Sequence, residues 1–227
     1  PANMLADFAG GGMLCAMGIL LALQERHHSG KGQVVDAAML DGAAGFSTMF
    51  HGMLAHHLMT LDIGTNPLDG GAPFYQTYET SDGLYMAVGA VEQRFYGALL
   101  EGLELDPQTL PHQFDMQQWP KMIDRFAEVF KTRTRDEWTS VFQGKDACVT
   151  PVLNLNEVGE HPHNQERNLI IDMDGIPQPA PAPRLSRTPG RADPAKGPRG
   201  ADTVDILGEL GYNKERINDL IKGEVAE

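Results

Sequence analysis

Near the beginning of the sequence a carboxylate lies close to three consecutive glycines. Asp7 stands three residues before the triplet at 10–12, and a helix-forming stretch follows. Glycine lacks a Cβ, so its backbone N–H groups can approach a ligand closely, and a helix that begins beyond them favours negative charge. Asp7 could therefore act as a general base or a nucleophile beside donors for a developing oxyanion. Capping of the helix would explain the same carboxylate, so both interpretations stay open.

Two further positions could contribute to a site. Glu92 is expected at the start of a helix, where it could either serve a site or only complement the helix dipole. Tyr75 and Tyr78 end a linker rich in glycine and proline. Their rings could line a pocket or hold the linker against the core.

Other kinds of chemistry find little support in the residues. The histidines do not have the spacing of three or four convergent ligands, so we expect no metal site. Cys15 lies in an apolar helical stretch and is expected in the core. The methionines between Met39 and Met59 are typical of core filling, or of an adaptable surface for acyl chains. The sequence also contains no P-loop and no nucleophile elbow.

The composition narrows the class of protein. The 18 Lys+Arg and 31 Asp+Glu residues give a net charge of −13, which argues against binding to nucleic acid or to an anionic membrane surface. A hydrophobic fraction of 41% over 227 residues predicts a folded core. Two cysteines, Cys15 and Cys148, are too few for a disulfide framework and favour a reducing compartment. We expect no membrane span, because no apolar run reaches about 18 residues, and no signal peptide. The sequence begins at Pro1, which suggests a fragment or a processed chain.

These candidate residues need elements that position them. In the first part we expect a glycine-rich loop, a buried helix over 13–28, a short strand over 33–39 and a helix over 40–60. This helix–strand–helix order is typical of an α/β layer.

A composition break at 65–78 predicts an extended linker, after which the pattern is that of an α+β region. Ser81-Asp82-Gly83 is a turn signal, Thr134 and Glu137 form a capping box, and Pro151 favours a strand edge. The expected elements are strands over 76–80 and 84–90, helices over 91–103, 117–131 and 134–142, and a strand over 147–153. Residues 154–167 are expected to form a loop and a helix, residues 176–198 a proline-rich extended connector, and residues 202–211 and 214–222 two short helices.

Five stretches, taken together, resemble the α-methylacyl-CoA racemases, which are members of the family III CoA-transferases. They occur in family order over roughly residues 3–211, which makes the resemblance more specific than any single motif. The stretches are LADFAGGG at 5–12, SGKGQVVDA at 29–37, LDGGAPFY at 68–75, AVGAVE at 87–92 and DACVTPV at 146–152.

The resemblance implies an α/β fold with a Rossmann-like large domain, here incomplete, and a small α+β domain. In the family two subunits interlock, and each active site forms between one large domain and the partner's small domain. The implied divisions are 1–40 as the end of the large domain, 41–75 as linker, 76–162 as the small domain, 163–181 as a second linker and 182–227 as the return to the large domain.

The resemblance also implies a reaction: 1,1-proton transfer at C2 of a 2-methylacyl-CoA thioester through an enolate. Asp7 matches one acid/base and Glu92 the carboxylate that orients a catalytic histidine. Asn3, Gly10, Gly11 and Tyr75 match positions near the substrate.

The catalytic histidine lies upstream of the aspartate motif in the family, and none of the eight histidines here matches it, nor do we find the CoA-phosphate contacts. Coenzyme A enters as part of the substrate, so no separate cofactor is expected, and the implied partner is a second copy of the chain. The implied compartment is the cytoplasm in a bacterium, or the mitochondrion or peroxisome in a eukaryote. Two alternatives stay open: a family III CoA-transferase with Asp7 as nucleophile, or an inactive fragment.

Overall fold

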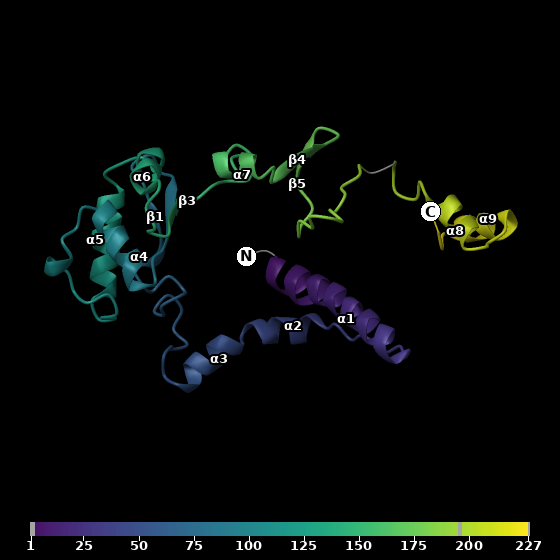
Figure 1. Ribbon diagram of the computed structural model, residues 1–227, viewed down its shortest axis with the longest axis horizontal. Coiled ribbons are helices and arrows are strands. Elements are labelled where there is room, and N and C mark those ends of the chain that lie inside the picture. Colours follow the sequence, from purple (N-terminus) through teal and green to yellow (C-terminus); the bar gives the residue numbers. More distant parts are fainter. Residues whose placement is uncertain (1–2, 195–196, 227) are drawn as a thin grey trace. The chain divides into compact units, whose positions relative to one another are not determined.

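The computed structural model describes residues 3–194 and 197–226 (Figure 1). The chain divides into two compact units, Pro1–Val152 and Leu153–Glu227, and each is described by itself. Pro1 and Ala2 of the expected first loop, and residues 195–196 of the expected connector, lie outside the described residues. The domain boundaries that the resemblance implies stay a prediction.

The first unit begins with a long helix. A π-helical segment, η1 (Met4–Met13), continues into α1 (Leu14–Ser29), which ends at Gly30 with a positive φ of 73°. The expected loop over the three glycines is wrong, because these residues lie inside η1. Glycine has no side chain, but the hydrogen bonds of a helix join backbone N–H and C=O groups and so can form at glycine as well.

The apolar surface of α1 is largely exposed. None of its residues is buried, and Leu20 and Leu21 are 67% and 61% exposed. The expectation of a buried helix is therefore wrong for the described residues. A helix that is apolar almost all round needs neighbours on every side, and here only its beginning and one face meet the stretch that leads into α2.

Together η1 and α1 meet the length and composition of a membrane span. Over Met4–Ser29 the mean hydropathy of the most apolar window of 18 residues is 1.7, and 11% of that window is buried. By length and mean hydropathy, the expectation that no apolar segment is long enough to span a membrane is wrong. Small and weakly polar residues interrupt the apolar run but lower its mean hydropathy only slightly. A core helix of a soluble protein and a signal sequence meet the same criterion.

The strand expected over 33–39 does not form in the described residues. Residues 31–38 are extended coil, and Val34 is 93% exposed. A strand needs a neighbour for its N–H and C=O groups, and these residues pair with none of the described strands. The helix expected over 40–60 is divided into α2 (Met39–Phe46) and α3 (Thr48–Ala55), which meet at Ser47.

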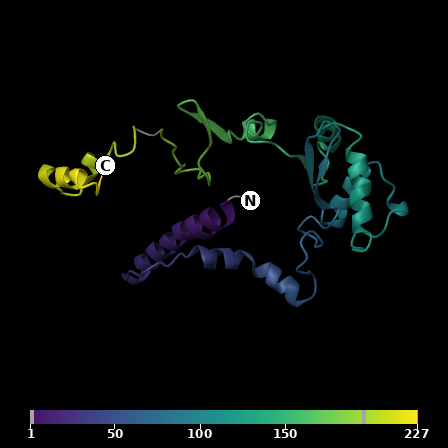
Figure 2. The ribbon, with the colours of Figure 1, turned by 180° about the vertical axis from the view of Figure 1, so that it is seen from behind.

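Close packing of small residues joins η1 to α2. Figure 2 shows the blue helix α2 beside the purple N-terminal helix. A Cβ on Gly42 would lie 2.1 Å from the carbonyl oxygen of Gly10, and a Cβ on Gly10 would lie 3.1 Å from the amide nitrogen of Ala43. The two backbones can therefore come this close because Gly42 lacks a side chain, and a Cβ on Gly10 would also make a tight contact.

The predicted hairpin is confirmed within an antiparallel sheet of order β1-β2-β3. Its strands are β1 (Tyr75–Glu79), β2 (Tyr85–Gly89) and β3 (Val149–Pro151). The turn between β1 and β2 closes through a hydrogen bond from the Thr80 amide to the Leu84 carbonyl, and Gly83 supplies the positive φ of 78° that the turn needs.

The predicted helices beside this sheet are also confirmed. They are α4 (Gln93–Gly102), α5 (Trp119–Phe130) and α6 (Arg135–Phe142), with a short 3-10 turn, η2 (Pro107–Thr109), after α4. The expected capping box of α6 is present, since the Thr134 and Glu137 side chains each accept from the other's backbone amide. An aromatic core joins the helices to the sheet: Phe130 is fully buried, and its ring stacks on Tyr78 with 4.9 Å between centroids.

The second unit carries a hairpin that the sequence reasoning missed. The strands β4 (Ile170–Met173) and β5 (Ile176–Pro179) pair antiparallel, so the expected connector begins as a strand. Alternate residues of a strand turn their N–H groups to opposite sides, and Ala180 donates to Leu169. Pro177 and Pro179 therefore lie on the outer edge of β5, where a missing N–H costs no ladder bond.

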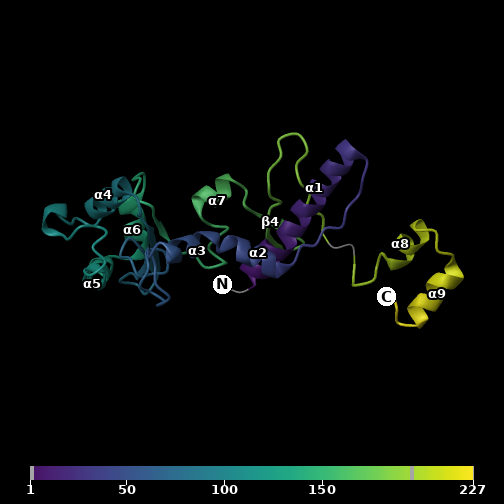
Figure 3. The same ribbon diagram turned by 90° about the horizontal axis from the view of Figure 1, so that it is seen from below.

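Three helices complete this unit: α7 (Pro162–Glu166), α8 (Thr203–Glu209) and α9 (Lys214–Lys222). The helices expected over 154–167, 202–211 and 214–222 are thus confirmed. Figure 3 shows α8 and α9 as a pair of helices. Ile217 of α9 is buried.

Candidate functional site

The candidate residues of η1 lie together on one short stretch. Asp7 and Phe8 both direct their backbone amides at the carbonyl oxygen of Asn3, at 3.2 and 3.4 Å. Asp7 and Asn3 are exposed, whereas Gly10 and Gly11 are buried against α2. The helix begins before Asp7 rather than after the glycines, so the expectation of a helix N-terminus beyond the triplet is wrong.

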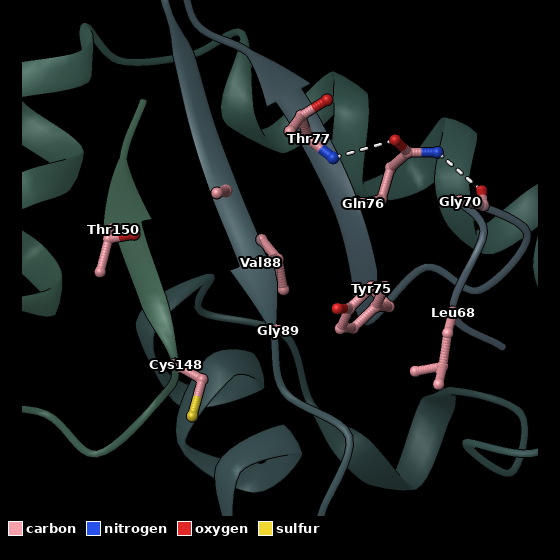
Figure 4. Close-up of a pocket in the computed structure, with 10 residues that line it drawn as sticks. Leu68, Gly70, Tyr75, Gln76, Thr77, Val88, Gly89, Cys148 and Thr150 are labelled. Atoms are coloured by element: carbon pink, nitrogen blue, oxygen red, sulfur yellow. Dashed lines mark hydrogen bonds between the residues drawn. The ribbon is translucent and has the colours of Figure 1, made fainter. Parts of the chain in front are cut away.

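Another candidate residue, Tyr75, lines a hollow of about 480 Å³ on one face of the sheet (Figure 4). Tyr75 on β1 is paired in register with Gly89 on β2, and Thr77 with Ala87. Residues directly opposite each other share one face of a sheet. The hollow therefore forms where small side chains on β2 leave the Tyr75 ring, which is 40% exposed, without a bulky neighbour.

The rim of this hollow is held by the loop that precedes β1. Leu68 and Gly70 line the hollow, and the Gln76 side chain donates through Nε2 to the Gly70 carbonyl at 2.7 Å. Figure 4 shows this bond together with the one from the Thr77 amide to Gln76 Oε1. Gln76 thereby ties the loop to the strand that carries Tyr75.

Asp69 and Asn66 fix the shape of the same loop. Asp69 Oδ1 accepts from the amides of Asn66 and Gly71, at 2.8 and 3.3 Å, and its Oδ2 accepts from the Gly64 amide and from Asn66 Nδ2, at 3.0 and 2.8 Å. Although partial desolvation acts the other way, these hydrogen bonds hold the pKa of Asp69 below its usual value. A Cβ on Gly71 would lie 2.5 Å from the carbonyl carbon of Thr65, so only glycine fits there.

Glu92 lies just beyond the end of β2, at the N-cap position of α4. Its carboxylate accepts no capping hydrogen bond from the first turn of that helix, and its side chain is exposed. Desolvation, then the charges of Asp146 and Glu92, raise the pKa of the Cys148 thiol, while Arg94 acts in the opposite sense. Cys148 lines the hollow. Glu92 therefore stands near the hollow with a carboxylate that α4 does not use.

The structure thus gathers the candidates into two groups on different parts of the chain. Asn3, Asp7, Gly10 and Gly11 belong to η1, and Tyr75 and Glu92 belong to the region of the sheet. The roles of these residues stay predictions.

Sequence reasoning missed some residues of the hollow, among them Cys148, Gln76 and Thr150. Cys148 and Thr150 stand inside one of the five motifs, which was the available signal. Gln76 gave no signal that distinguishes it from other polar residues on a strand. The described residues contain no group of three or more His, Cys, Asp and Glu side chains placed to hold a metal ion.

The fold has relatives among solved structures. A CaiB/BaiF family protein from Brucella suis matches with a TM-score of 0.72 and 22% sequence identity, over 92% of this chain and 56% of that one. The mixed helix and sheet architecture is therefore the family III CoA-transferase fold that the motifs predicted.

The sequence comparison defines the family. The sequence model of CoA-transferase family III matches residues 1–203, and the chain belongs to this family. It is also 47% identical to the α-methylacyl-CoA racemase of Mus musculus and 46% identical to that of Homo sapiens, in both cases over 100% of this chain and 60% of the relative. The chain thus spans about 60% of the length of these curated relatives.

Proposed function

We propose that the protein is a racemase of 2-methylacyl-CoA thioesters. The observation that carries this proposal is the identity of 46–47% to two α-methylacyl-CoA racemases along the whole chain. The two groups of candidate residues support it, since each offers carboxylate chemistry on an exposed surface, at Asp7 and at Glu92.

In the proposed reaction a base removes the proton at C2 of the acyl group, and an acid returns a proton to the opposite face. The thioester carbonyl delocalises the carbanion as an enolate, whose oxygen needs N–H donors. Asp7 acts on one face, and a histidine upstream of Asp7, which the resemblance implies, acts on the other. Glu92 orients that histidine by a hydrogen bond. No cofactor takes part, because coenzyme A belongs to the substrate.

The proposal includes a site assembled from two copies of the chain. In it, η1 of one copy supplies Asp7, and the sheet region of the other supplies Tyr75 and Glu92. The separation of the candidates into two groups on different parts of the chain supports this arrangement. The hollow beside Tyr75 would then receive part of the acyl-CoA.

The experiment that tests this proposal separates proton transfer from acyl transfer. The full-length protein is incubated with one epimer of a 2-methylacyl-CoA, with and without a free acid as acceptor, and then treated with hydroxylamine. A racemase gives the other epimer without an acceptor and forms no trapped adduct. Transfer of CoA to the acid together with a hydroxylamine-sensitive adduct on Asp7 would instead identify a CoA-transferase.

A further inference from the structure

A buried glutamine holds the segment that leads into Glu92. Gln113 is 6% exposed and lies in the stretch between η2 and α5. Its Nε2 donates to the carbonyl oxygens of Ala90, at 3.2 Å, and Val91, at 2.8 Å. These are the two residues directly before Glu92, so one amide group fixes the path of the chain from β2 into α4.

The same segment is fixed on its other sides as well. The Gly89 amide donates to the Cys148 carbonyl at 2.9 Å, and the Val91 amide donates to the Gly89 carbonyl at 3.0 Å. The carbonyl of Glu92 accepts from the Tyr96 amide at 2.9 Å as α4 begins. The backbone around Glu92 is therefore set by neighbours, while its own carboxylate stays exposed.

Gln113 is itself held in place. Trp119 donates through Nε1 to the Gln113 carbonyl at 2.9 Å, and Trp119 is 3% exposed at the start of α5. The indole also packs edge-on against Phe74, with 5.7 Å between ring centroids. The glutamine amide therefore approaches Ala90 and Val91 from a rigid part of the core.

The other end of the amide shows that Gln113 does more than fill space. Its Oε1 is buried and has no hydrogen-bond partner among the described residues. A buried polar atom without a partner destabilises the folded state, and an apolar side chain of the same shape would avoid that cost. The two hydrogen bonds that Nε2 donates to Ala90 and Val91 offset this cost and are specific to the amide group.

We propose that Gln113 is a positioning residue that acts through Glu92. It holds the carbonyls of Ala90 and Val91 so that the Glu92 carboxylate points toward the residue that it orients. This inference rests on the proposed racemase function. A displacement of about 1 Å in such a carboxylate is enough to slow a reaction by as much as about a hundredfold.

The test is a double-mutant cycle in the full-length protein, which measures deuterium exchange at C2 of a 2-methylacyl-CoA. Gln113→Met keeps the length and removes the amide, and Glu92→Gln removes the orienting charge. With Glu92 present, we expect Gln113→Met to lower kcat about tenfold or more and to change KM less than about threefold. With Glu92→Gln already present, we expect the same change to lower kcat less than about threefold.

Two further variants keep the test decisive. Thr134→Ala removes the capping box of α6 in the same folded region, and we expect it to lower the melting temperature without changing kcat. If Gln113→Met does not fold, Gln113→Asn replaces it. Its amide is one methylene shorter and must lose at least one of the two bonds, so it should show the same dependence on Glu92.

The outcomes separate the inference from the function on which it rests. A wild-type protein that exchanges no deuterium overturns the proposed function and this inference with it. A wild-type protein that exchanges, with equal losses from the Gln113 variant in both backgrounds, overturns the inference alone. Loss of kcat in Thr134→Ala to the same extent would also overturn it, because the effect would then follow stability and not Glu92.

Discussion

Replacement of Asn66 by alanine should open the loop that forms the rim of the hollow. Asn66 is 5% exposed, and its side chain makes four hydrogen bonds. Nδ2 donates to the carbonyls of Thr60 and Asp62 and to Asp69 Oδ2, at 3.3, 3.1 and 2.8 Å, and Oδ1 accepts from the Thr60 amide at 2.8 Å. The substitution removes all four at once.

The magnitude follows from those bonds. A hydrogen bond contributes about 0.5–1.5 kcal/mol net, so four of them set an upper range of about 2–6 kcal/mol. Thr60, Asp62 and Asp69 are exposed and can bond to water once the side chain is gone, so the lower end applies. We expect Asn66→Ala to lower the free energy of opening of this loop by about 2–3 kcal/mol, which is a factor of about 30–150 in its opening constant.

Amide hydrogen exchange followed by mass spectrometry measures this opening directly. The amides of Gly64 and Gly71, which Asp69 holds, should lose protection by that factor, while amides of α5 should keep theirs. Asp106→Ala is the control, because Asp106 caps η2 with a single bond to the Gln108 amide at 2.9 Å. Unchanged protection at Gly64 and Gly71 in Asn66→Ala, or an equal change in the control, would mean that Asn66 does not hold this loop closed.

Four other substitutions test the helix packing, the buried tyrosine and the proposed catalytic roles. Gly42→Ala should push α2 away from η1, because its Cβ would lie 2.1 Å from the Gly10 carbonyl oxygen. Thermal melting followed by near-ultraviolet circular dichroism should show that the free energy of unfolding falls by more than about 2 kcal/mol. An unchanged melting temperature would contradict this packing. Burial raises the pKa of Tyr78, and its hydroxyl donates to the Pro73 carbonyl at 2.7 Å. An unfolded tyrosine ionises at about pH 10, so Tyr78 contributes its full stability below that pH and loses it as the pH rises further. Melting temperatures measured from pH 8 to 11 should fall less steeply for Tyr78→Phe than for the wild type, and parallel curves would contradict the assignment. In the full-length protein Asp7→Asn should lower C2 exchange by at least about a hundredfold and Glu92→Gln by less, because Glu92 only orients its partner; the reverse order would overturn these roles.

The sheet region could be predicted from the sequence because its signals are local. The turn at Asp82-Gly83 and the capping box at Thr134 each specify an element through residues a few positions apart. The hairpin of β4 and β5 was missed because proline density suggested a connector. Two prolines can occur in β5 because the nitrogens of Pro177 and Pro179 both face away from β4, where no ladder hydrogen bond is needed.

The first part of the chain was harder because its structure depends on contacts beyond each segment. The apolar stretch at Val34 suggested a strand, but a strand forms only where another strand can pair with it. The glycine triplet suggested a loop, yet Gly10 lies in a helix whose close contact with Gly42 requires a bare Cα. No local pattern shows which distant residue will approach a glycine.

The candidate site was predicted through motifs, and the residues that support it were not. Asp7, Tyr75 and Glu92 stood in motifs of the family, whereas Gln113 has no signal in the sequence. Its importance comes from a contact with Ala90 and Val91 that spans more than 20 positions of the chain. Such a contact becomes visible only when the segment before α5 and the end of β2 are seen together.

Deuterium exchange in D₂O shows directly whether this protein catalyses proton transfer at C2 of a 2-methylacyl-CoA. The full-length protein is incubated in D₂O with a single epimer of the thioester, and the C2 position of both epimers is followed by nuclear magnetic resonance. We expect the substrate to become a mixture of the two epimers, with deuterium at C2 of the newly formed one. If several 2-methylacyl-CoAs all keep their configuration and their C2 proton, the protein is not a racemase of these thioesters.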